Sequence, residues 1–265
     1  MNSFTNNNSY FFVPKGSRKT APLFVFLPGM DETGKELMTI QIGNLETVFD
    51  VRCFVIPPDN MTGWDHLASQ AIALTRSALA QKPQTTAYLC GESFGGCLAL
   101  KILRRSPELF DHIILINPAS SFPRIPWLNL GSYLLPWTPN WIYESSAILA
   151  LPFLAHLQDL SAESRKSLLK ATRLAPRHTA AKRLELLRNF QIEERQLQQL
   201  KQPVLLIASE GDRLFPSVAE IKRLAQFFQH AQVITLAHSG HACLIENDVN
   251  LHLLLERNRF LPFVK

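Results

Sequence analysis

The chain has 265 residues, of which 46% are hydrophobic and 18% are charged, and its formal net charge is +5. This is the composition of an ordinary globular protein, with enough apolar material for a core in one or two domains. The N-terminus has no basic stretch leading into an apolar one, so no secretory signal is expected. The longest apolar passage, near residues 147–157, is shorter than the about 20 residues of a spanning helix. We therefore expect a cytoplasmic protein that is at most peripheral to a membrane.

The positive charge is concentrated in one part of the chain. Residues 159–201 contain ten Lys/Arg and five Asp/Glu, so this segment carries a net charge of +5 and the rest is balanced. No nucleic-acid recognition motif accompanies the charge, so nucleic acid is not an expected partner. Two readings remain: solvated helix faces, which we favour, and contact with an anionic membrane surface.

The four cysteines indicate neither metal binding nor disulfides. Cys53, Cys90, Cys97 and Cys243 form no C-x-x-C pair and no spacing typical of metal ligands. Two of them flank the motif described below, where a small apolar residue packs well. We expect reduced, buried thiols, and no metal or other cofactor.

Strand and helix patterns alternate over the first part of the chain. β-rich runs predict strands at residues 10–13, 23–27, 51–56, just before Gly91, and at 112–116. Helices are expected near residues 35–42, after a capping box at 62–65, and from the Gly91 region to Pro107. Such alternation predicts a mostly parallel sheet that is covered by helices on both faces.

The alternation stops at residue 119 and resumes near residue 203. Between them we find no convincing strand, a Pro- and Trp-rich stretch at 122–143, and helical patterns near 143–156, 161–174 and 179–190. Strands are again expected at 204–208 and 232–236, with helices opening at Pro216-Ser217 and spanning about 248–260. The prediction is an α/β core formed by residues 1–118 and 203–265, with a helical cap inserted at 119–202.

The turn around Ser93 is the strongest functional signal. Gly91-Glu92-Ser93-Phe94-Gly95 fits G-x-S-x-G, and an apolar strand precedes it while an apolar-periodic helix follows. In this context the motif forms a nucleophile elbow, in which the serine hydroxyl points off the end of the sheet. The flanking glycines keep side chains from colliding with the strained backbone. We assign Ser93 as the candidate nucleophile.

A serine hydroxyl needs a base, and later strands supply candidates. Ligands in an open α/β sheet meet the loops at the carboxyl ends of the strands. The loop after 204–208 contains Asp212, with Glu210 as the alternative, and the loop after 232–236 contains His241, with His238 as the alternative. The order Ser, Asp, His predicts Ser93 as nucleophile, His241 as general base and acid, and Asp212 as the orienting carboxylate.

A tetrahedral oxyanion also requires hydrogen-bond donors. The backbone N–H of the residue after the nucleophile, Phe94, is one candidate. The loop after residues 23–27 supplies the other, and Met30 in Pro28-Gly29-Met30 is our choice. Only the backbone matters for this role.

Four segments together resemble a known family. They are Val-Phe-Leu-Pro-Gly-Met-Asp at 25–31, Gly-Glu-Ser-Phe-Gly-Gly-Cys-Leu-Ala-Leu at 91–100, Ile-Asn-Pro-Ala at 116–119 and Ser-Gly-His-Ala-Cys-Leu-Ile-Glu at 239–246. They look like the esterase, lipase and thioesterase branch of the α/β hydrolases, and more closely like the hydrolase half of plastid phytyl ester synthases and their cyanobacterial relatives. The resemblance implies an α/β-hydrolase fold and ester chemistry. The plant proteins carry a further acyltransferase-like domain, which we do not expect in this protein.

The combined reading is a serine hydrolase that cleaves carboxylic esters with apolar acyl chains, or transfers their acyl groups. We expect the apolar stretch 122–157 to line a hydrocarbon pocket, with Trp127, Trp137 and Trp141 as substrate contacts. A thioesterase or small-ester carboxylesterase is the alternative within enzymes. A catalytically inactive binding protein of the same fold is the alternative outside them. The sequence does not predict the oligomeric state.

Overall fold

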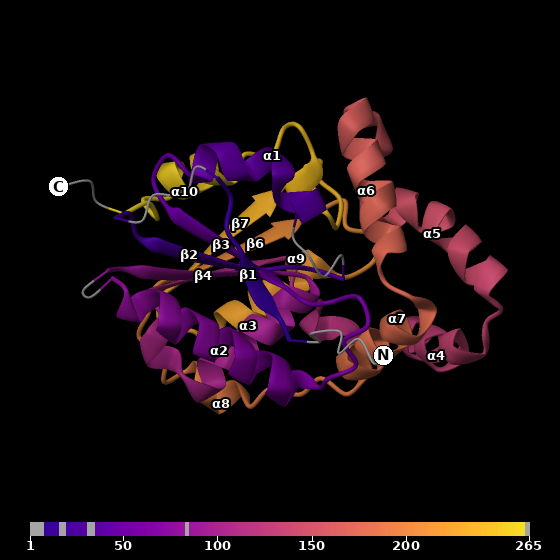
Figure 1. Cartoon of the computed structure of the whole chain (residues 1–265), viewed down its shortest axis with the longest axis horizontal. Coiled ribbons are helices and arrows are strands. Elements are labelled where there is room, and N and C mark those ends of the chain that lie inside the picture. The colour runs from indigo at the N-terminus through magenta and orange to yellow at the C-terminus, as the bar shows by residue number, and fades with distance from the viewer. Residues whose placement is uncertain (1–7, 16–19, 31–34, 83–84, 263–265) are drawn as a thin grey trace, which may run out of the picture.

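The computed structural model describes residues 8–15, 20–30, 35–82 and 85–262. Its centre is a seven-stranded sheet with the order β1-β3-β2-β4-β5-β6-β7, in which β1 runs antiparallel to β3 and the other neighbours are parallel (Figure 1). The strands are β1 (Tyr10–Phe12), β2 (Leu23–Leu27), β3 (Asp50–Val55), β4 (Ala87–Glu92), β5 (His112–Ile116), β6 (Val204–Ser209) and β7 (Ala231–Leu236). The mostly parallel sheet predicted from the sequence is confirmed.

Helices cover both faces of this sheet, as the unbroken apolar runs of its strands require. The core helices are α1 (Lys35–Leu45), α2 (Trp64–Ala80), α3 (Phe94–Arg105), α9 (Ser217–Ala225) and α10 (Leu251–Arg257). Short 3₁₀ turns lie at η1 (Pro107–Leu109) and η5 (Cys243–Ile245). Figure 1 shows α1 and α10 on one face and α2 and α3 on the other.

The strands divide their side chains between these two helical layers. In β2, Leu23 and Val25 pack in the cluster that contains α2, α3 and α9, whereas Phe24 and Phe26 pack in the cluster that contains α1 and α10. Successive side chains of a strand point to opposite faces, so a fully buried strand must be apolar at every position. This arrangement places the carboxyl ends of the parallel strands at one edge, beneath the cap.

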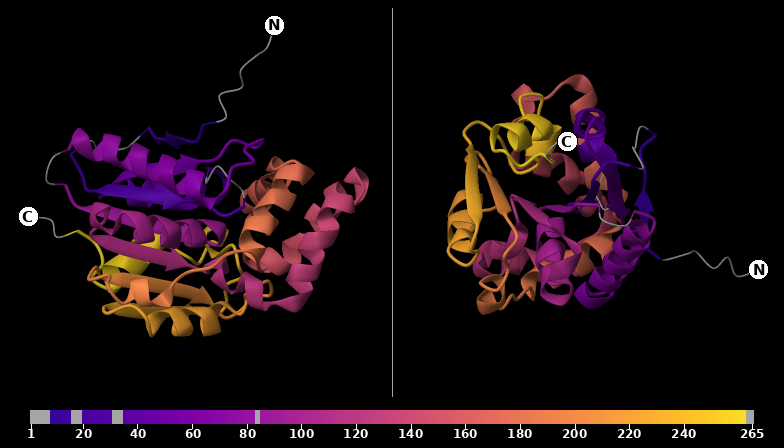
Figure 2. Two further views of the ribbon diagram at one scale, coloured as in Figure 1. Left: turned by 90° about the horizontal axis from the view of Figure 1, so that it is seen from below. Right: turned by 90° about the vertical axis from the view of Figure 1, so that its left-hand side faces the viewer.

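The cap is inserted between β5 and β6 and lies beyond that edge (Figures 1 and 2). Its elements are η2 (Ala119–Arg124), α4 (Pro126–Leu134), η3 (Leu135–Trp137), α5 (Asn140–Leu154), η4 (Leu157–Asp159), α6 (Ala162–Leu174) and α7 (Arg177–Arg188). The last helix before β6, α8 (Glu194–Leu197), packs instead on the core layer through Leu197, and Leu200 of the following turn packs there as well. The division of the chain at 119 and 202 stays a prediction.

Three local predictions differ from the structure. Helix α4 occupies part of the Pro-rich stretch for which no helix was expected, because Pro126 stands at its first turn, where a proline removes no hydrogen bond. The capping box at 62–65 is absent: Gly63 is the N-cap of α2, and the Thr62 hydroxyl donates to Asn60 Oδ1 at 2.6 Å. The last helix is limited to Leu251–Arg257, after the short turn η5.

The cysteines behave as expected. All four are free and buried, and burial raises the pKa of the Cys90, Cys97 and Cys243 thiols well above the usual value. Such thiols stay protonated near neutral pH. Within the described residues, no helix combines the length and the apolar character needed to cross a bilayer.

Candidate active site

The backbone at Ser93 is strained in the manner of a nucleophile elbow. Its φ of 52° and ψ of −114° lie in a region that residues with a Cβ rarely adopt. Hydrogen bonds on both sides hold this conformation: Ser93 N donates to Ile116 O at 3.0 Å, and Ala119 N donates to Ser93 O at 3.1 Å. The serine is thereby attached to the end of β5 while it stands at the start of α3.

Two glycines of the motif are required by close backbone packing. A Cβ on Gly91 would lie 2.4 Å from Gly95 O, across the strand-to-helix turn. A Cβ on Gly95 would lie 2.1 Å from Leu27 O and 2.5 Å from Pro28 O. The first turn of α3 therefore packs directly on the end of β2, and only glycine permits that distance.

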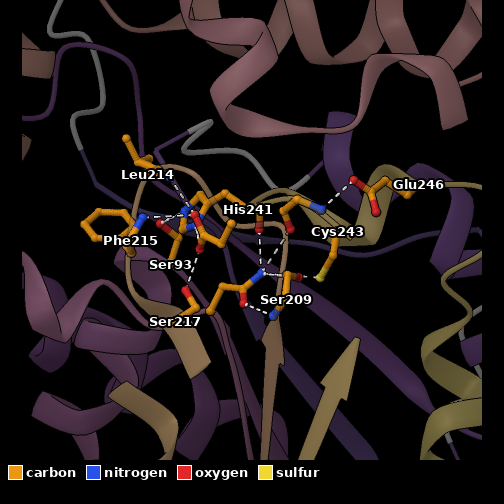
Figure 3. A network of polar contacts seen from close by, with 11 residues as sticks. Ser93, Ser209, Leu214, Phe215, Ser217, His241, Cys243 and Glu246 are labelled. Carbon is orange, nitrogen blue, oxygen red and sulfur yellow. Dashed lines mark hydrogen bonds and ion pairs between the residues drawn. The ribbon is translucent and has the colours of Figure 1, made fainter. Parts of the chain in front are cut away.

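The structure brings Ser93, His241 and Asp212 together from three separate strand ends. His241 Nε2 lies 2.8 Å from Ser93 Oγ, and His241 Nδ1 lies 2.7 Å from Asp212 Oδ2. Figure 3 shows Ser93 and His241 within this network. Both side chains of the His–Asp pair are buried, at 6% and 1% exposure. The three residues thus have the geometry of a serine, base and orienting carboxylate.

The Asp212 carboxylate is held by more than the imidazole. Its Oδ1 accepts hydrogen bonds from the amides of Leu214 and Phe215, at 2.9 and 3.0 Å, and the Ser217 hydroxyl donates to its Oδ2. Burial alone would raise the pKa of Asp212, but the charge of His241 and hydrogen bonds from His241 and Ser217 lower it below its usual value. The group is therefore an anion at neutral pH, as the orienting role demands.

The competing candidates lie outside this arrangement. Glu210 and His238 are both exposed at the surface. Ser217, at which the sequence predicted a helix to open, lies in the first turn of α9, and its hydroxyl donates to Asp212 Oδ2. This bond is charge-assisted because its acceptor is a carboxylate, and the N-cap residue of α9, Pro216, makes no side-chain hydrogen bond to the helix.

Two buried side chains that the sequence reasoning left without a role hold the loops that carry the candidate residues. The amide of Asn117 donates to His241 O at 2.8 Å and to Ser209 Oγ at 3.0 Å, and it accepts from Ser209 N at 2.8 Å. Glu246 Oε1 accepts from Gly240 N at 2.9 Å and from His156 N at 3.2 Å, so it joins the His241 loop to the end of α5. One signal was available in the sequence for each residue: Asn117 directly follows a predicted strand, and Glu246 is a charged residue at the end of an apolar run.

Met30 and Phe94, the predicted oxyanion donors, lie in the loop after β2 and at the start of α3, and their role stays a prediction. Met30 is on the wall of the cavity described below, together with Gly29 and Ser93. Phe94 opens α3, and the first N–H groups of a helix lack intrahelical acceptors. The ring of Phe94 stacks on the indole of Trp64, at 4.5 Å between centroids, and the buried guanidinium of Arg183 from α7 lies 5.5 Å from its centroid. The cap thus supports the residue whose amide is the candidate donor.

A cavity of about 230 Å³ opens above Ser93 and His241. Its wall is largely apolar, and the Tyr143 hydroxyl on that wall is bonded to Ala175 O at 2.9 Å. Besides Gly29, Met30, Ser93, Tyr143, Ala175 and His241, the lining residues are Glu92, Phe122, Leu128, Leu154, Leu168, Ala171, Thr172, Ala180, Leu184, Leu187, Leu214, Phe215 and Ala242. The volume is somewhat below the roughly 300–1,000 Å³ of typical small-molecule sites.

The three tryptophans predicted as substrate contacts are not on this wall. Trp127, Trp137 and Trp141 are 57%, 85% and 70% exposed, and none of them is among the residues that line the cavity. The wall is built to a large extent by α6 and α7, within the charged segment 159–201 that was expected to face solvent. These helices are amphipathic, so their charged side chains do not stop their apolar faces from lining the site.

The fold and the site geometry define an α/β hydrolase. The family model described as "alpha/beta hydrolase fold" matches residues 27–248, and the chain belongs to this family. Phytyl ester synthase 1, chloroplastic, of Arabidopsis thaliana is 31% identical over 253 residues, which cover 87% of this chain and 36% of that protein. The chain therefore spans about a third of the length of this relative.

Other relatives agree at the level of the family. The pimeloyl-[acyl-carrier protein] methyl ester esterase of Nitrosomonas europaea is 28% identical over 165 residues, which cover 58% of this chain and 64% of that protein. Among solved structures, MenH from S. aureus superimposes with a TM-score of 0.75 at 17% identity, covering 95% of this chain and 99% of that one. At that identity the likeness concerns the fold alone.

Proposed function

We propose that the protein is a serine hydrolase that acts on carboxylic esters with apolar acyl chains. The observation that carries the proposal is the hydrogen-bonded series Ser93–His241–Asp212 at the base of an apolar cavity. The family membership and the esters named for the relatives are consistent with it.

The reaction follows from the positions of these groups. His241 Nε2 accepts the proton of Ser93 Oγ as the oxygen attacks the ester carbonyl carbon. The carbonyl oxygen becomes an oxyanion, which the backbone N–H groups of Met30 and Phe94 stabilise. His241 then donates its proton to the departing alcohol oxygen, and the C–O bond of the ester breaks. The acyl group remains on Ser93 until water, activated by the same imidazole, releases it as the acid.

Transfer of the acyl group to an apolar alcohol is the second candidate activity. Ser93 is only 9% exposed and His241 only 4%, so water has limited access to the acyl-enzyme. An apolar alcohol in the same cavity would compete with water for the acyl carbon, in a site that excludes bulk solvent. Adding decanol to an ester assay and quantifying the decyl ester distinguishes the two acceptors. Acid as the sole product would exclude transfer to that alcohol.

Active-site labelling tests the core of the proposal. A fluorophosphonate probe should label the wild-type protein, but not Ser93→Ala or His241→Ala. His238→Ala is the matched control, because that histidine lies three residues away and is exposed. The members of a triad act as one unit. In kinetic assays the double variant of Ser93 and His241 should therefore have a kcat barely lower than that of either single variant. Loss of labelling in His238→Ala with retention in His241→Ala would refute the assignment, and no labelling of the wild type would favour a binding protein.

A series of p-nitrophenyl esters tests the apolar acyl chain. Each fully buried CH₂ contributes about 0.8 kcal/mol, or roughly fourfold in kcat/KM, so this ratio should rise from acetate to medium chains. Ala171→Phe places a bulky ring on the cavity wall and should lower the ratio for long esters more than for acetate. Trp137→Ala should leave the slope unchanged, since that side chain lies outside the cavity. A steady fall from acetate onward would favour the small-ester carboxylesterase.

A further inference from the structure

The outer surface of the cap carries an unusual concentration of exposed apolar side chains. Sixteen large hydrophobic residues are exposed in the described part of the chain, and ten of them lie between residues 127 and 153. We call this surface of α4, η3 and α5 the cap face, and its most prominent members are Trp127, Leu130, Trp137, Trp141, Leu149 and Phe153. Single exposed hydrophobic residues are ordinary, but a contiguous set marks an interaction surface.

Helix α5 shows that this surface has no covering layer within the described structure. Its inner residues Tyr143 and Leu154 line the cavity, while Trp141, Leu149 and Phe153 face outward and are exposed. A helix that is apolar all round is normally buried on every side. Figures 1 and 2 show α4 and α5 at the end of the molecule away from the sheet, where no other element covers their outer side.

Charge and composition indicate what covers the cap face. Between residues 125 and 155, Glu144 is the single charged residue, so the face offers few groups that could specify a polar protein partner. Tryptophan and tyrosine are the residues enriched where hydrocarbon meets headgroups. Helix α6, which packs beside α5, exposes Arg165, Lys166 and Arg173. Apolar and aromatic groups next to basic ones match a phospholipid surface, with its hydrocarbon and its phosphates.

The length of α5 indicates how it would meet such a surface. At a rise of about 1.5 Å per residue its 15 residues span roughly 22 Å, less than the about 30 Å of a bilayer core. Docked on such a surface, a helix of this length would lie in the plane of the interface, with its outer side among the acyl chains. Because its inner residues Tyr143 and Leu154 line the cavity, α5 would then separate the lipid hydrocarbon from the site.

We propose that the cap face docks on a phospholipid surface and that the apolar ester is taken from that lipid phase. The second half rests on the proposed function, whereas docking does not. Insertion of the aromatic side chains provides the binding, and the basic residues of α6 add a contribution on acidic lipid. This reassigns Trp137 and Trp141 from the substrate to the membrane.

Vesicle sedimentation with the inactive Ser93→Ala protein tests docking independently of catalysis. The protein should bind phosphatidylcholine vesicles, and the double change Trp137→Ser and Trp141→Ser should weaken the partition coefficient at least tenfold. The matched control is Val233→Ser with Leu253→Ser, which removes two exposed apolar side chains from outside the cap. That control should bind like its parent. Equal binding of the tryptophan variant and its parent, or no binding of the parent to any vesicle, would overturn the proposal.

Acidic vesicles and a soluble substrate separate the remaining explanations. Phosphatidylglycerol should strengthen binding, and Arg165→Ala with Lys166→Ala should remove that gain while leaving binding to phosphatidylcholine intact. The tryptophan variant should keep wild-type activity on p-nitrophenyl acetate in solution but lose activity on an ester dissolved in vesicles. If the protein docks on vesicles but hydrolyses no ester, the docking proposal stands and the proposed function is rejected. A dimer that the tryptophan changes dissociate, without vesicle binding, would instead make the cap face a contact between two copies of the chain.

Discussion

Replacing Gly95 by alanine is the sharpest test of how the fold builds the site. The new methyl group would lie 2.1 Å from Leu27 O and 2.5 Å from Pro28 O. Both neighbours are backbone atoms, so neither can rotate away as a side chain would. Either α3 or the end of β2 must retreat by about 1 Å to restore ordinary van der Waals contact.

This retreat separates the two candidate oxyanion donors. Phe94 N is carried by α3, and Met30 N is carried by the loop that follows β2. Losing the alignment of one donor costs about 10²–10³ in kcat, and overpacking of a tight site costs about 1–3 kcal/mol in the free energy of unfolding. We therefore expect Gly95→Ala to remain folded but to lose kcat on p-nitrophenyl butyrate by two orders of magnitude or more, with a smaller change in KM.

Two further glycines provide a graded control. At Gly96 a Cβ would lie 2.9 Å from the Cβ of Pro118, so alanine there should give an intermediate defect. At Gly131, in α4, nothing lies within 4 Å, and alanine should leave kcat unchanged while adding up to about 1 kcal/mol of stability through helix propensity. Urea unfolding measured beside the kinetics separates lost fold from lost alignment. If Gly95→Ala matched Gly131→Ala in both measurements, the reasoning about the donors would be wrong.

Three other changes probe the groups around the triad. Asp212→Asn should lower kcat by about 10⁴-fold, measured by steady-state kinetics, because the imidazole loses its orienting anion. Since the pKa of Asp212 is lower in the folded than in the unfolded chain, its stabilising effect is complete above the unfolded pKa of about 3.9 and is lost as the pH falls further. The asparagine variant should therefore lose less stability than wild type in urea titrations between pH 5 and pH 3, and equal losses would contradict this. Glu246→Ala leaves Gly240 N and His156 N without their acceptor, and should lower kcat about tenfold with a rescue by Glu246→Gln. Asn117→Ala should lower kcat by a similar factor without altering the slope of the acyl-chain series, and a changed slope would place Asn117 in substrate selection instead.

Short-range patterns in the sequence were sufficient for the sheet and for the triad candidates. The motif around Ser93 combines a strand, glycines and a helix within one local stretch, so it is readable without knowledge of the fold. Asp212 and His241 follow two later strands, and parallel strands all deliver their carboxyl ends to one edge. The rule that predicts a parallel sheet thus also predicts that these loops meet.

The side chains that hold those loops in place could not be predicted from local sequence patterns. Asn117, Ser217 and Glu246 each bind partners that are set by the packing of separate elements, such as the bond from Ser217 to Asp212 across the start of α9. Serine near the start of a helix is commonly an N-cap. Local helix propensity does not predict that its hydroxyl donates a hydrogen bond to a buried carboxylate.

The cap shows the same division most clearly. Its apolar and aromatic composition is visible in the sequence, but composition does not tell which side of a helix faces the cavity. In α5, Tyr143 turns inward and Trp141 turns outward, although both are aromatic and two positions apart. The sequence by itself determined the parallel sheet, the elbow and the order of the candidate triad, because these depend on periodicity and chain order. Only the tertiary structure decided which hydrophobic residues line the site and which remain at the surface, because that depends on the orientation in which each cap helix packs over the strand ends.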